Sequence, residues 1–171
     1  SHHGNLYVSF IYDCPERDAR LSYAVAVAIC ETLASFGVRP TIKWPNDIFV
    51  DSAKIAGILI EYNGPFVIIG IGINIQSNPT VERYKTTKLD NYSVVVSKTE
   101  VVNRLMRNMD KWIRADFRAV RARWTDLAVG LNAPVKYQGE VAELVGINEN
   151  GALVLRRGTR YLLVYGDEIT V

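Results

Sequence analysis

Five segments in the first half of the chain are rich in β-branched and aromatic residues or form apolar runs between turn residues. Such segments are typical of β-strands. A turn at Pro45-Asn46-Asp47 separates the second segment from the third, and Asn63-Gly64 predicts a hairpin between the fourth and the fifth. The predicted strands cover residues 5–12, 41–43, 48–50, 54–61 and 66–75.

Two further segments show helical spacing of their apolar residues. The first is apolar on more than one side, so we expect a buried helix that opens at Pro15 and stops at Gly37. The second begins with a capping box formed by Ser97 and Glu100, and one long helix is expected from there to about Trp124. The polar stretch between the last strand and this helix predicts an irregular connection.

The pattern changes near residue 130, where short β segments separated by turns replace the helices. We therefore expect two units, an α/β body over residues 1–129 and a small all-β barrel over residues 130–171. The predicted strands of the second unit are 134–137, 140–146, 152–156, 161–164 and 168–171.

Composition narrows the class of protein. The chain has 171 residues, 49% hydrophobic and 22% charged, which supports a folded core and excludes general disorder. The formal charge of +2 gives no reason to expect nucleic acid or a membrane as partner. Cys14 and Cys30 lack metal-ligand spacing and no secretory signal opens the chain, so we expect a reducing, cytoplasmic setting.

Three motifs could carry chemistry. K-W-P-N-D (43–47) offers an amide and a carboxylate at a strand end, although an Asx turn alone would explain the last two residues. Lys54 precedes a buried strand, where a solvated strand end is the ordinary explanation. G-I-G-I-N (70–74) lies inside a strand and lacks the third glycine of a dinucleotide fingerprint.

Strand parity gives the third motif a specific meaning. Gly70, Gly72 and Asn74 share one face, while the isoleucines share the other. The glycine face would be bare backbone, as a close-fitting ligand wall requires, or it would be covered by a helix or an aromatic ring. With a turn of two or four residues centred on Asn63-Gly64, Gly57 would face Gly70 and leave a slot without side chains.

Taken together, these motifs resemble the biotin protein ligases. K-W-P-N-D, followed by K-I-A-G-I-L-I-E whose Lys54 lies seven residues after Asp47, and then G-I-G-I-N, is a specific set. The resemblance runs nearly end to end. The resembling segments are 4–7 with Ser9, 43–47, 54–61, 70–74, Asn132, 134–135, 146–147, 151–153 and 166–168.

The resemblance implies an α+β fold akin to class II aminoacyl-tRNA synthetases, with helices packed on a mixed sheet and an SH3-like β-barrel after it. It implies a two-step reaction in which biotin and MgATP give biotinyl-5′-AMP and pyrophosphate. A specific lysine on the biotin carboxyl carrier protein or domain of acetyl-CoA carboxylase then attacks the adenylate. No covalent enzyme intermediate is expected, so catalysis would depend on orientation and charge stabilisation. A homodimer formed through the sheet is also implied.

The resemblance also assigns roles to residues. Lys54 would contact the biotin carboxylate and the α-phosphate, and Asp47 would help to hold Mg²⁺. These two residues are the catalytic candidates. The other candidates are a biotin-binding wall of Gly57, Leu59, Gly70 and Gly72, and an ATP-binding set of Asn46, Asn74 and Lys43.

In the family, a G-R-G-R-x-G loop, the first sheet elements and a Ser/Thr pair that touches biotin precede the G-N-L-Y strand, and residues 1–171 do not contain them. We therefore expect this polypeptide alone to bind biotin weakly and to form the adenylate poorly. No winged-helix segment is present in these residues, so no DNA partner is expected. Two alternatives stay open: a lipoate or octanoate ligase of the same architecture, and a non-catalytic module that binds a partner.

Overall fold

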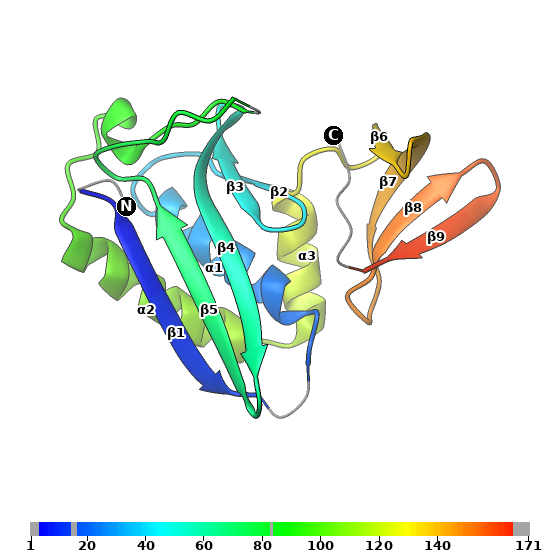
Figure 1. Ribbon diagram of the computed structural model, residues 1–171, viewed down its shortest axis with the longest axis horizontal. Coiled ribbons are helices and arrows are strands. Elements are labelled where there is room, and N and C mark those ends of the chain that lie inside the picture. Colours follow the sequence, from blue (N-terminus) through cyan, green and yellow to red (C-terminus); the bar gives the residue numbers. More distant parts are fainter. Residues whose placement is uncertain (1–3, 15–16, 83, 166–171) are drawn as a thin grey trace.

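The computed structural model describes residues 4–14, 17–82 and 84–165 (Figure 1). Three features expected from the sequence lie outside these residues: the helix start at Pro15, the strand 168–171 and the resembling segment 166–168. Within the described ranges, no helix is long and apolar enough to cross a membrane.

The body of the protein is a five-stranded sheet with strand order β1-β5-β4-β3-β2. All five predicted strands are confirmed, and every pair of neighbouring strands is antiparallel. The expected mixed sheet is therefore wrong for the described part of the chain, where parallel pairing is confined to isolated bridges. The strands are β1 (Leu6–Asp13), β2 (Thr41–Lys43), β3 (Asp47–Val50), β4 (Ala53–Asn63) and β5 (Phe66–Ile73).

Three α-helices cover one face of this sheet (Figure 1). Helix α1 (Leu21–Ala34) contacts β2, β3 and β4 on one side and α2 (Lys98–Ile113) and α3 (Phe117–Leu127) on the other. This position explains why α1 is apolar on more than one side. Among the described residues of the predicted irregular connection, the one regular element is a short 3₁₀ helix, η1 (Leu89–Tyr92).

The predicted extents of both helices are wrong, since residues 17–20 are not helical and the second helix is divided. Helix α1 begins at Leu21, because the Asp18 carboxylate accepts a hydrogen bond from the backbone N–H of Arg20 and holds a turn there. The predicted long helix is two helices, because Asp116 starts a new one as its N-cap and accepts from the N–H of Arg118 at 2.7 Å. The Ser97 cap of α2 is confirmed, since its hydroxyl accepts from the N–H of Glu100.

The β4–β5 hairpin does not have the predicted register. Asn63 pairs with Phe66, so the two residues between them form the turn and every opposed pair shifts by two positions. Gly57 therefore faces Gly72, not Gly70, and Leu59 faces Gly70. A shift of two residues preserves the face of each side chain, so the glycines still share one side of the sheet. The isoleucines of the G-I-G-I-N motif are buried on the other side, as predicted.

After residue 130 the chain forms a second, four-stranded antiparallel sheet with order β6-β7-β8-β9. The expected change to short strands is thus confirmed, while the described strands form an open meander and no closed barrel. The segment that leads into this sheet is held to the body by the N–H of Val129, which donates to the carbonyl of Ile42, and the sheet itself contacts α1 where the Tyr23 hydroxyl donates to the Gly151 carbonyl. The strands are β6 (Pro134–Tyr137), β7 (Glu140–Ile147), β8 (Leu153–Arg157) and β9 (Arg160–Val164).

Candidate active site

One transverse row of residues crosses the sheet face that the helices leave open. Strand pairing places Lys43 opposite Asp47, Asp47 opposite Gly57, Gly57 opposite Gly72, and Gly72 opposite Tyr7. Directly opposed residues in antiparallel strands project to the same face. The K-W-P-N-D motif, the strand after Lys54 and the G-I-G-I-N motif therefore meet in one row, although they are separated along the chain.

A groove of about 420 Å³ lies over this row. Its floor is open because the glycines leave backbone where side chains would stand. A β-carbon added at Gly70 would lie 3.6 Å from the Leu59 Cβ, and one added at Gly72 would lie 3.5 Å from the Tyr7 ring. The predicted wall of Gly57, Leu59, Gly70 and Gly72 is thus assembled along one groove.

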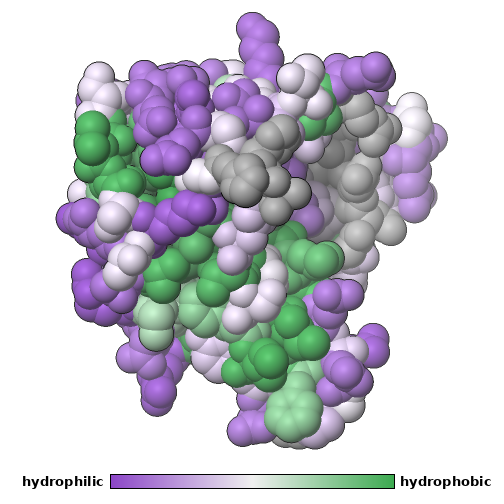
Figure 2. All heavy atoms as spheres, turned by 60° about the vertical axis from the view of Figure 1, so that its left-hand side comes forward, coloured by the Kyte–Doolittle hydropathy of each residue, from purple (hydrophilic) through white to green (hydrophobic). Residues whose placement is uncertain are grey.

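The alternative explanation for the glycines, a covering helix or ring, applies at one position. The Tyr7 ring lies beside Gly72, but Tyr7 is itself 53% exposed, and Leu59 at the other end is 59% exposed. Beyond the groove the same strand face continues as apolar surface, with Ile11 67% and Phe66 45% exposed. Seen from the side of β1, apolar side chains gather below the middle of the molecule and polar ones above it (Figure 2).

Lys54 reaches this face through a β-bulge. Ala56 pairs with Ile48 and Lys54 pairs with Phe49, so Ile55 is an extra residue without a partner on β3. Ile55 and Ala56 are both buried, at 0% and 3% exposure. Strict alternation from Gly57 would place Lys54 on the core face, three residues away. The extra residue reverses the alternation and aims Lys54 at the groove.

The Lys54 ammonium lies at the end of the groove in a defined environment. Its Nζ atom forms an ion pair with Asp47 Oδ1 at 2.5 Å, and both side chains are 22% exposed. A β-carbon added at Gly57 would stand 3.3 Å from this ammonium. On the other side, the Tyr84 ring centroid lies 5.2 Å from Nζ, a cation–π distance. The structure therefore brings the two catalytic candidates together beside the glycine floor.

The ATP-binding candidates are placed differently. Asn46 Nδ2 donates to the Ile58 carbonyl at 3.0 Å, which holds the turn against β4. Asn74 Nδ2 donates to the Thr87 carbonyl, and its Oδ1 accepts from Asn5 Nδ2 at 3.3 Å. Both side-chain amides thus have a structural hydrogen bond, while Asn46 alone of the two lines the groove.

Lys43, the third ATP-binding candidate, occupies the β2 end of the row. Its Nζ lies 5.7 Å from the centre of the Phe49 ring. Phe49 is also the residue of β3 that pairs with Lys54 on β4. The groove lining does not include Lys43. The position is compatible with a cation that serves a ligand extending past Asp47, toward β2.

Two side chains at the site were not among the predicted site residues, although one of them, Asn5, lies in the resembling segment 4–7. Tyr84 comes from the polar connection after β5, and the backbone carries it to Lys54 because the Lys54 N–H donates to the Lys85 carbonyl at 2.8 Å. Asn5 supports Asn74 and accepts from the N–H groups of Ile75 and Ser77. Lys54 is joined to the loop that carries Tyr84 by a parallel bridge with Thr86. Such a contact between distant segments cannot be predicted from hydrophobic periodicity or motif spacing.

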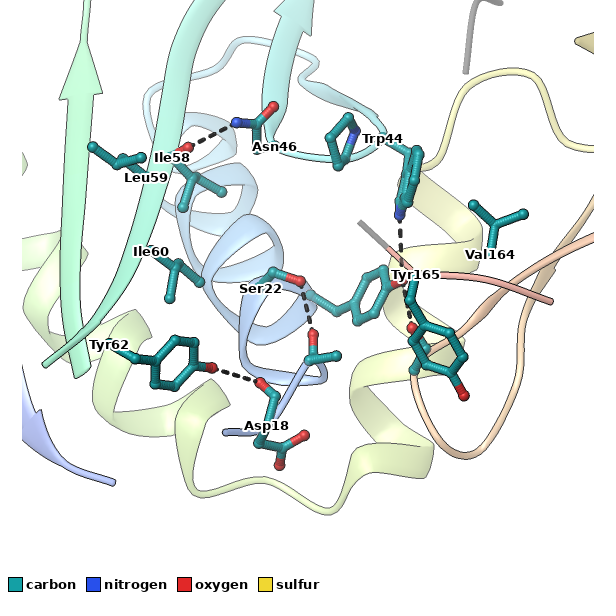
Figure 3. A pocket seen from close by; sticks show the side chains of 14 residues that line it. Asp18, Ser22, Trp44, Asn46, Ile58, Leu59, Ile60, Tyr62, Val164 and Tyr165 are labelled. Carbon is teal, nitrogen blue, oxygen red and sulfur yellow. Dashed lines mark hydrogen bonds between the residues drawn. The ribbon is translucent and has the colours of Figure 1, made fainter. Parts of the chain in front are cut away.

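A second cavity, of about 340 Å³, lies between the body and the second sheet (Figure 3). It shares Asn46, Ile58 and Leu59 with the groove, so the two hollows lie on either side of the same strand segment. In Figure 3 the Trp44 indole and the Tyr165 ring stand on the side of the second sheet, opposite Leu59. The K-W-P-N-D turn therefore separates the groove from the junction of the two sheets.

Comparison with solved structures assigns the fold. The structure superimposes on the biotin protein ligase of Aquifex aeolicus with a TM-score of 0.85 at 22% identity, covering 98% of this chain and 81% of that one. A complex of the same Aquifex aeolicus protein with biotin and ATP gives a TM-score of 0.80. The α+β fold is therefore that of this class of ligases.

Sequence comparison assigns the family. Residues 1–78 match the Biotin/lipoate A/B protein ligase family. The biotin–[acetyl-CoA-carboxylase] ligase of Paracoccus denitrificans is 30% identical over 160 residues, which cover 81% of this chain and 67% of that protein. The ligase of the same name from Mycobacterium tuberculosis is 29% identical, over 87% of this chain and 61% of the relative. The chain belongs to the biotin protein ligase family, and it spans about three fifths of the length of the Mycobacterium tuberculosis relative.

Proposed function

We propose that this chain forms the reaction core of an ATP-dependent biotin–protein ligase. It would activate biotin as biotinyl-5′-AMP and transfer the biotinyl group to a lysine of a biotin carboxyl carrier domain. The observation that carries the proposal is the Lys54–Asp47 pair at the end of a groove floored by glycine backbone. The names of the curated relatives and the biotin and ATP complex of the Aquifex aeolicus protein support it.

The first step brings two anions together, and Lys54 would stand between them. A carboxylate oxygen of biotin attacks the α-phosphorus of ATP, the bond to the bridging oxygen breaks, and pyrophosphate leaves. The Lys54 ammonium has three donors, one of which is used by Asp47. The others remain to bind the carboxylate and an α-phosphate oxygen, each such charge-assisted hydrogen bond contributing roughly 1.5–3 kcal/mol.

The glycine floor would hold the apolar part of biotin. Because Gly57, Gly70 and Gly72 carry no side chains, the compact bicyclic ring system of biotin could lie close against the strands. Leu59 would cover one side of it, since more than half of its surface is free. This arrangement directs the carboxyl end of the ligand toward Lys54.

Mg²⁺ would be held mainly by the nucleotide. Among the described residues, no group of three or more His, Cys, Asp or Glu side chains could hold a metal ion. Mg²⁺ commonly uses one or two carboxylates together with phosphate oxygens and water. Asp47 is a single carboxylate at the nucleotide end of the row, which fits this mode, and the ion would supply charge neutralisation to the phosphates.

In the second step, the acceptor lysine amine attacks the acyl carbonyl, the bond to the phosphate oxygen breaks and AMP leaves. Nothing in this step needs an enzyme nucleophile.

We further propose that the body, residues 1–129, resembles class II aminoacyl-tRNA synthetases, and that residues 130–171 form an SH3-like barrel. A cytoplasmic homodimer is the assembly proposed.

The description of the matching family includes both biotin and lipoate ligases, so the acid substrate needs a test of its own. Both named curated relatives above are biotin ligases, which favours biotin. Calorimetric titration of this protein with biotin and with lipoate separates the two. If binding heat is observed with lipoate and not with biotin, the protein belongs to the lipoate branch and this part of the proposal is overturned.

The reaction itself is tested by incubating the protein with biotin and α-labelled ATP and separating biotinyl-AMP from ATP. Lys54→Ala should reduce adenylate formation by at least roughly 10- to 150-fold, which corresponds to the loss of one of the two charge-assisted hydrogen bonds. Lys136→Ala, at an exposed position of β6, is the matched control and should leave the rate unchanged. Equal rates for Lys54→Ala and the unaltered protein would refute the proposed role and favour the partner-binding alternative.

A further inference from the structure

Tyr23, on the first turn of α1, connects the second sheet to the K-W-P-N-D turn. Its side chain is buried, with the residue only 3% exposed. The ring packs edge-on against Trp124, with centroids 5.4 Å apart, and tilted against Phe117 at 6.2 Å. Helix α3 therefore fixes the position of the hydroxyl group.

The Tyr23 hydroxyl makes two hydrogen bonds whose directions are unambiguous. It lies 2.9 Å from the Gly151 carbonyl, which can only accept, so the single hydroxyl proton points there. The Trp44 indole N–H can only donate, and it donates to the hydroxyl oxygen at 3.3 Å. Figure 3 shows the Trp44 indole aimed into this junction. Burial is the main cause that raises the pKa of Tyr23, so the hydroxyl stays protonated and keeps this arrangement.

The second sheet approaches this hydroxyl by a turn that has no side chain at the contact. Gly151 has φ +77°, and a β-carbon there would lie 3.0 Å from the Arg20 Cγ and 3.5 Å from the Tyr23 ring. Asn148 holds the turn, because its Oδ1 accepts from the N–H groups of Asn150 and Ala152. The carbonyl of Gly151 is thus presented to α1 in a fixed direction.

On the other side of the hydroxyl, the Trp44 indole stands at the start of the turn that carries Asp47. Two residues later, Asn46 is joined to Ile58 by two hydrogen bonds, one from its side chain and one to its carbonyl from the Ile58 N–H. Asp47 follows and forms the ion pair with Lys54. A rotation of the indole would therefore be passed to the residues that line the groove.

We propose that Tyr23 is a positioning residue, whose hydroxyl links the Gly151 turn of the second sheet to Trp44 and so sets the position of Asp47 at the groove. As far as catalysis is concerned, this inference rests on the proposed function. It assigns a role to the second sheet within this chain: its turn contributes to the site through one hydrogen bond and without direct contact with a ligand.

The test compares two Tyr→Phe variants that remove the same atom at different places. Tyr23→Phe removes the link, whereas Tyr62→Phe removes a hydroxyl that donates to the Asp18 carbonyl at 3.1 Å and does not contact Trp44. Amide hydrogen exchange is measured at Ile58, whose N–H reports on the turn, and at Asp90, whose N–H donates to the Ile75 carbonyl and reports on a local opening that leaves the Tyr23 link intact.

Tyr23→Phe should accelerate exchange at Ile58 by about tenfold, because a buried indole N–H loses its acceptor, and should leave Asp90 unchanged. The indole N–H resonance of Trp44 is assigned by its absence in Trp44→Phe. In Tyr23→Phe its chemical shift should move to that of an indole N–H without a hydrogen bond. Tyr62→Phe should change neither signal. In the adenylation assay, Tyr23→Phe should lower kcat while the KM for biotin is retained.

An unchanged Ile58 in Tyr23→Phe, or equal acceleration at Ile58 and Asp90, would overturn the proposal. If Tyr23→Phe does not fold, Trp44→Phe removes the donor from the other end, and the same comparison of Ile58 with Asp90 decides. The unaltered protein serves to separate the two inferences. Its failure to form biotinyl-AMP refutes the proposed function, whereas the exchange experiment decides on Tyr23 without any activity.

Discussion

Gly57→Ala tests whether the bare backbone of the groove serves ligand binding or merely packing. Gly57 is not in the left-handed region of backbone space, so alanine is compatible with its conformation. The new methyl group would lie 3.3 Å from the Lys54 Cε and Nζ atoms and 3.7 Å from Asp47 Oδ1. The first contact is slightly too close, and a shift of a few tenths of an ångström in a flexible side chain relieves it.

The expected change in folding stability is small. Replacing glycine by alanine at a compatible position stabilises by about 0.4–1 kcal/mol through the unfolded state. A displaced Lys54–Asp47 pair, partly exposed to solvent, would cost about the same at most. The free energy of unfolding should therefore change by less than about 1 kcal/mol.

Ligand binding should respond much more strongly. The methyl group projects into a groove of about 420 Å³ at the point where the ammonium meets its floor. Overfilling a fitted site costs about 1–3 kcal/mol, so biotin affinity should fall roughly 5- to 150-fold. Calorimetry gives the affinity, and urea unfolding followed by circular dichroism gives the stability.

Gly70→Ala provides the comparison for this experiment. Its methyl group would make an ordinary 3.6 Å contact with the Leu59 Cβ and would not approach Lys54. We expect it to weaken biotin binding while adenylation at saturating biotin is retained, whereas Gly57→Ala should reduce both. Unchanged biotin affinity in Gly57→Ala, or a loss of more than about 2 kcal/mol in stability, would refute the reasoning.

Three further changes test other parts of the structure. Asp47→Asn keeps the shape of the side chain but removes the charge paired with Lys54, so adenylation should fall by at least about tenfold with little loss of stability, as measured by adenylate formation and urea unfolding. The side-chain hydrogen bond from Arg20 is the main cause that lowers the pKa of Asp18 from its ordinary value, so this pair stabilises the fold above the ordinary pKa and its contribution is lost as the pH falls through the lowered one; an NMR titration should show the shift, and Arg20→Gln, which keeps the backbone N–H, should reduce it. Asp116→Ala removes the cap that separates α3 from α2 and should cost about 1 kcal/mol by urea unfolding, an effect that Asp116→Asn should largely avoid.

The pattern of residues by itself determined the strands of both sheets and the face on which each glycine lies. Apolar alternation is local, and the side-chain period of two fixes a face without knowledge of the partner strand. For the same reason the glycines of G-I-G-I-N could be assigned to one side, and the error of two positions in the hairpin register left that assignment intact. Motif spacing was enough to indicate the family.

The helices show where local signals were insufficient. The capping signal of Ser97 was legible, because the residues that make it are neighbours in the chain. The break at Asp116 was missed, since apolar spacing continues through it and a single carboxylate decides between one helix and two.

Only the tertiary structure decided how the site is assembled. Lys54 faces the groove because one extra residue, Ile55, is accommodated in β4, and this bulge depends on pairing with β3. Asn74 and Asn46, which look like ligand-binding amides in the sequence, each have a hydrogen bond to backbone brought near by folding. Residue type is fixed by the sequence, but the partner of a polar side chain and the register of a strand are fixed by contacts between distant segments, which no local period can specify.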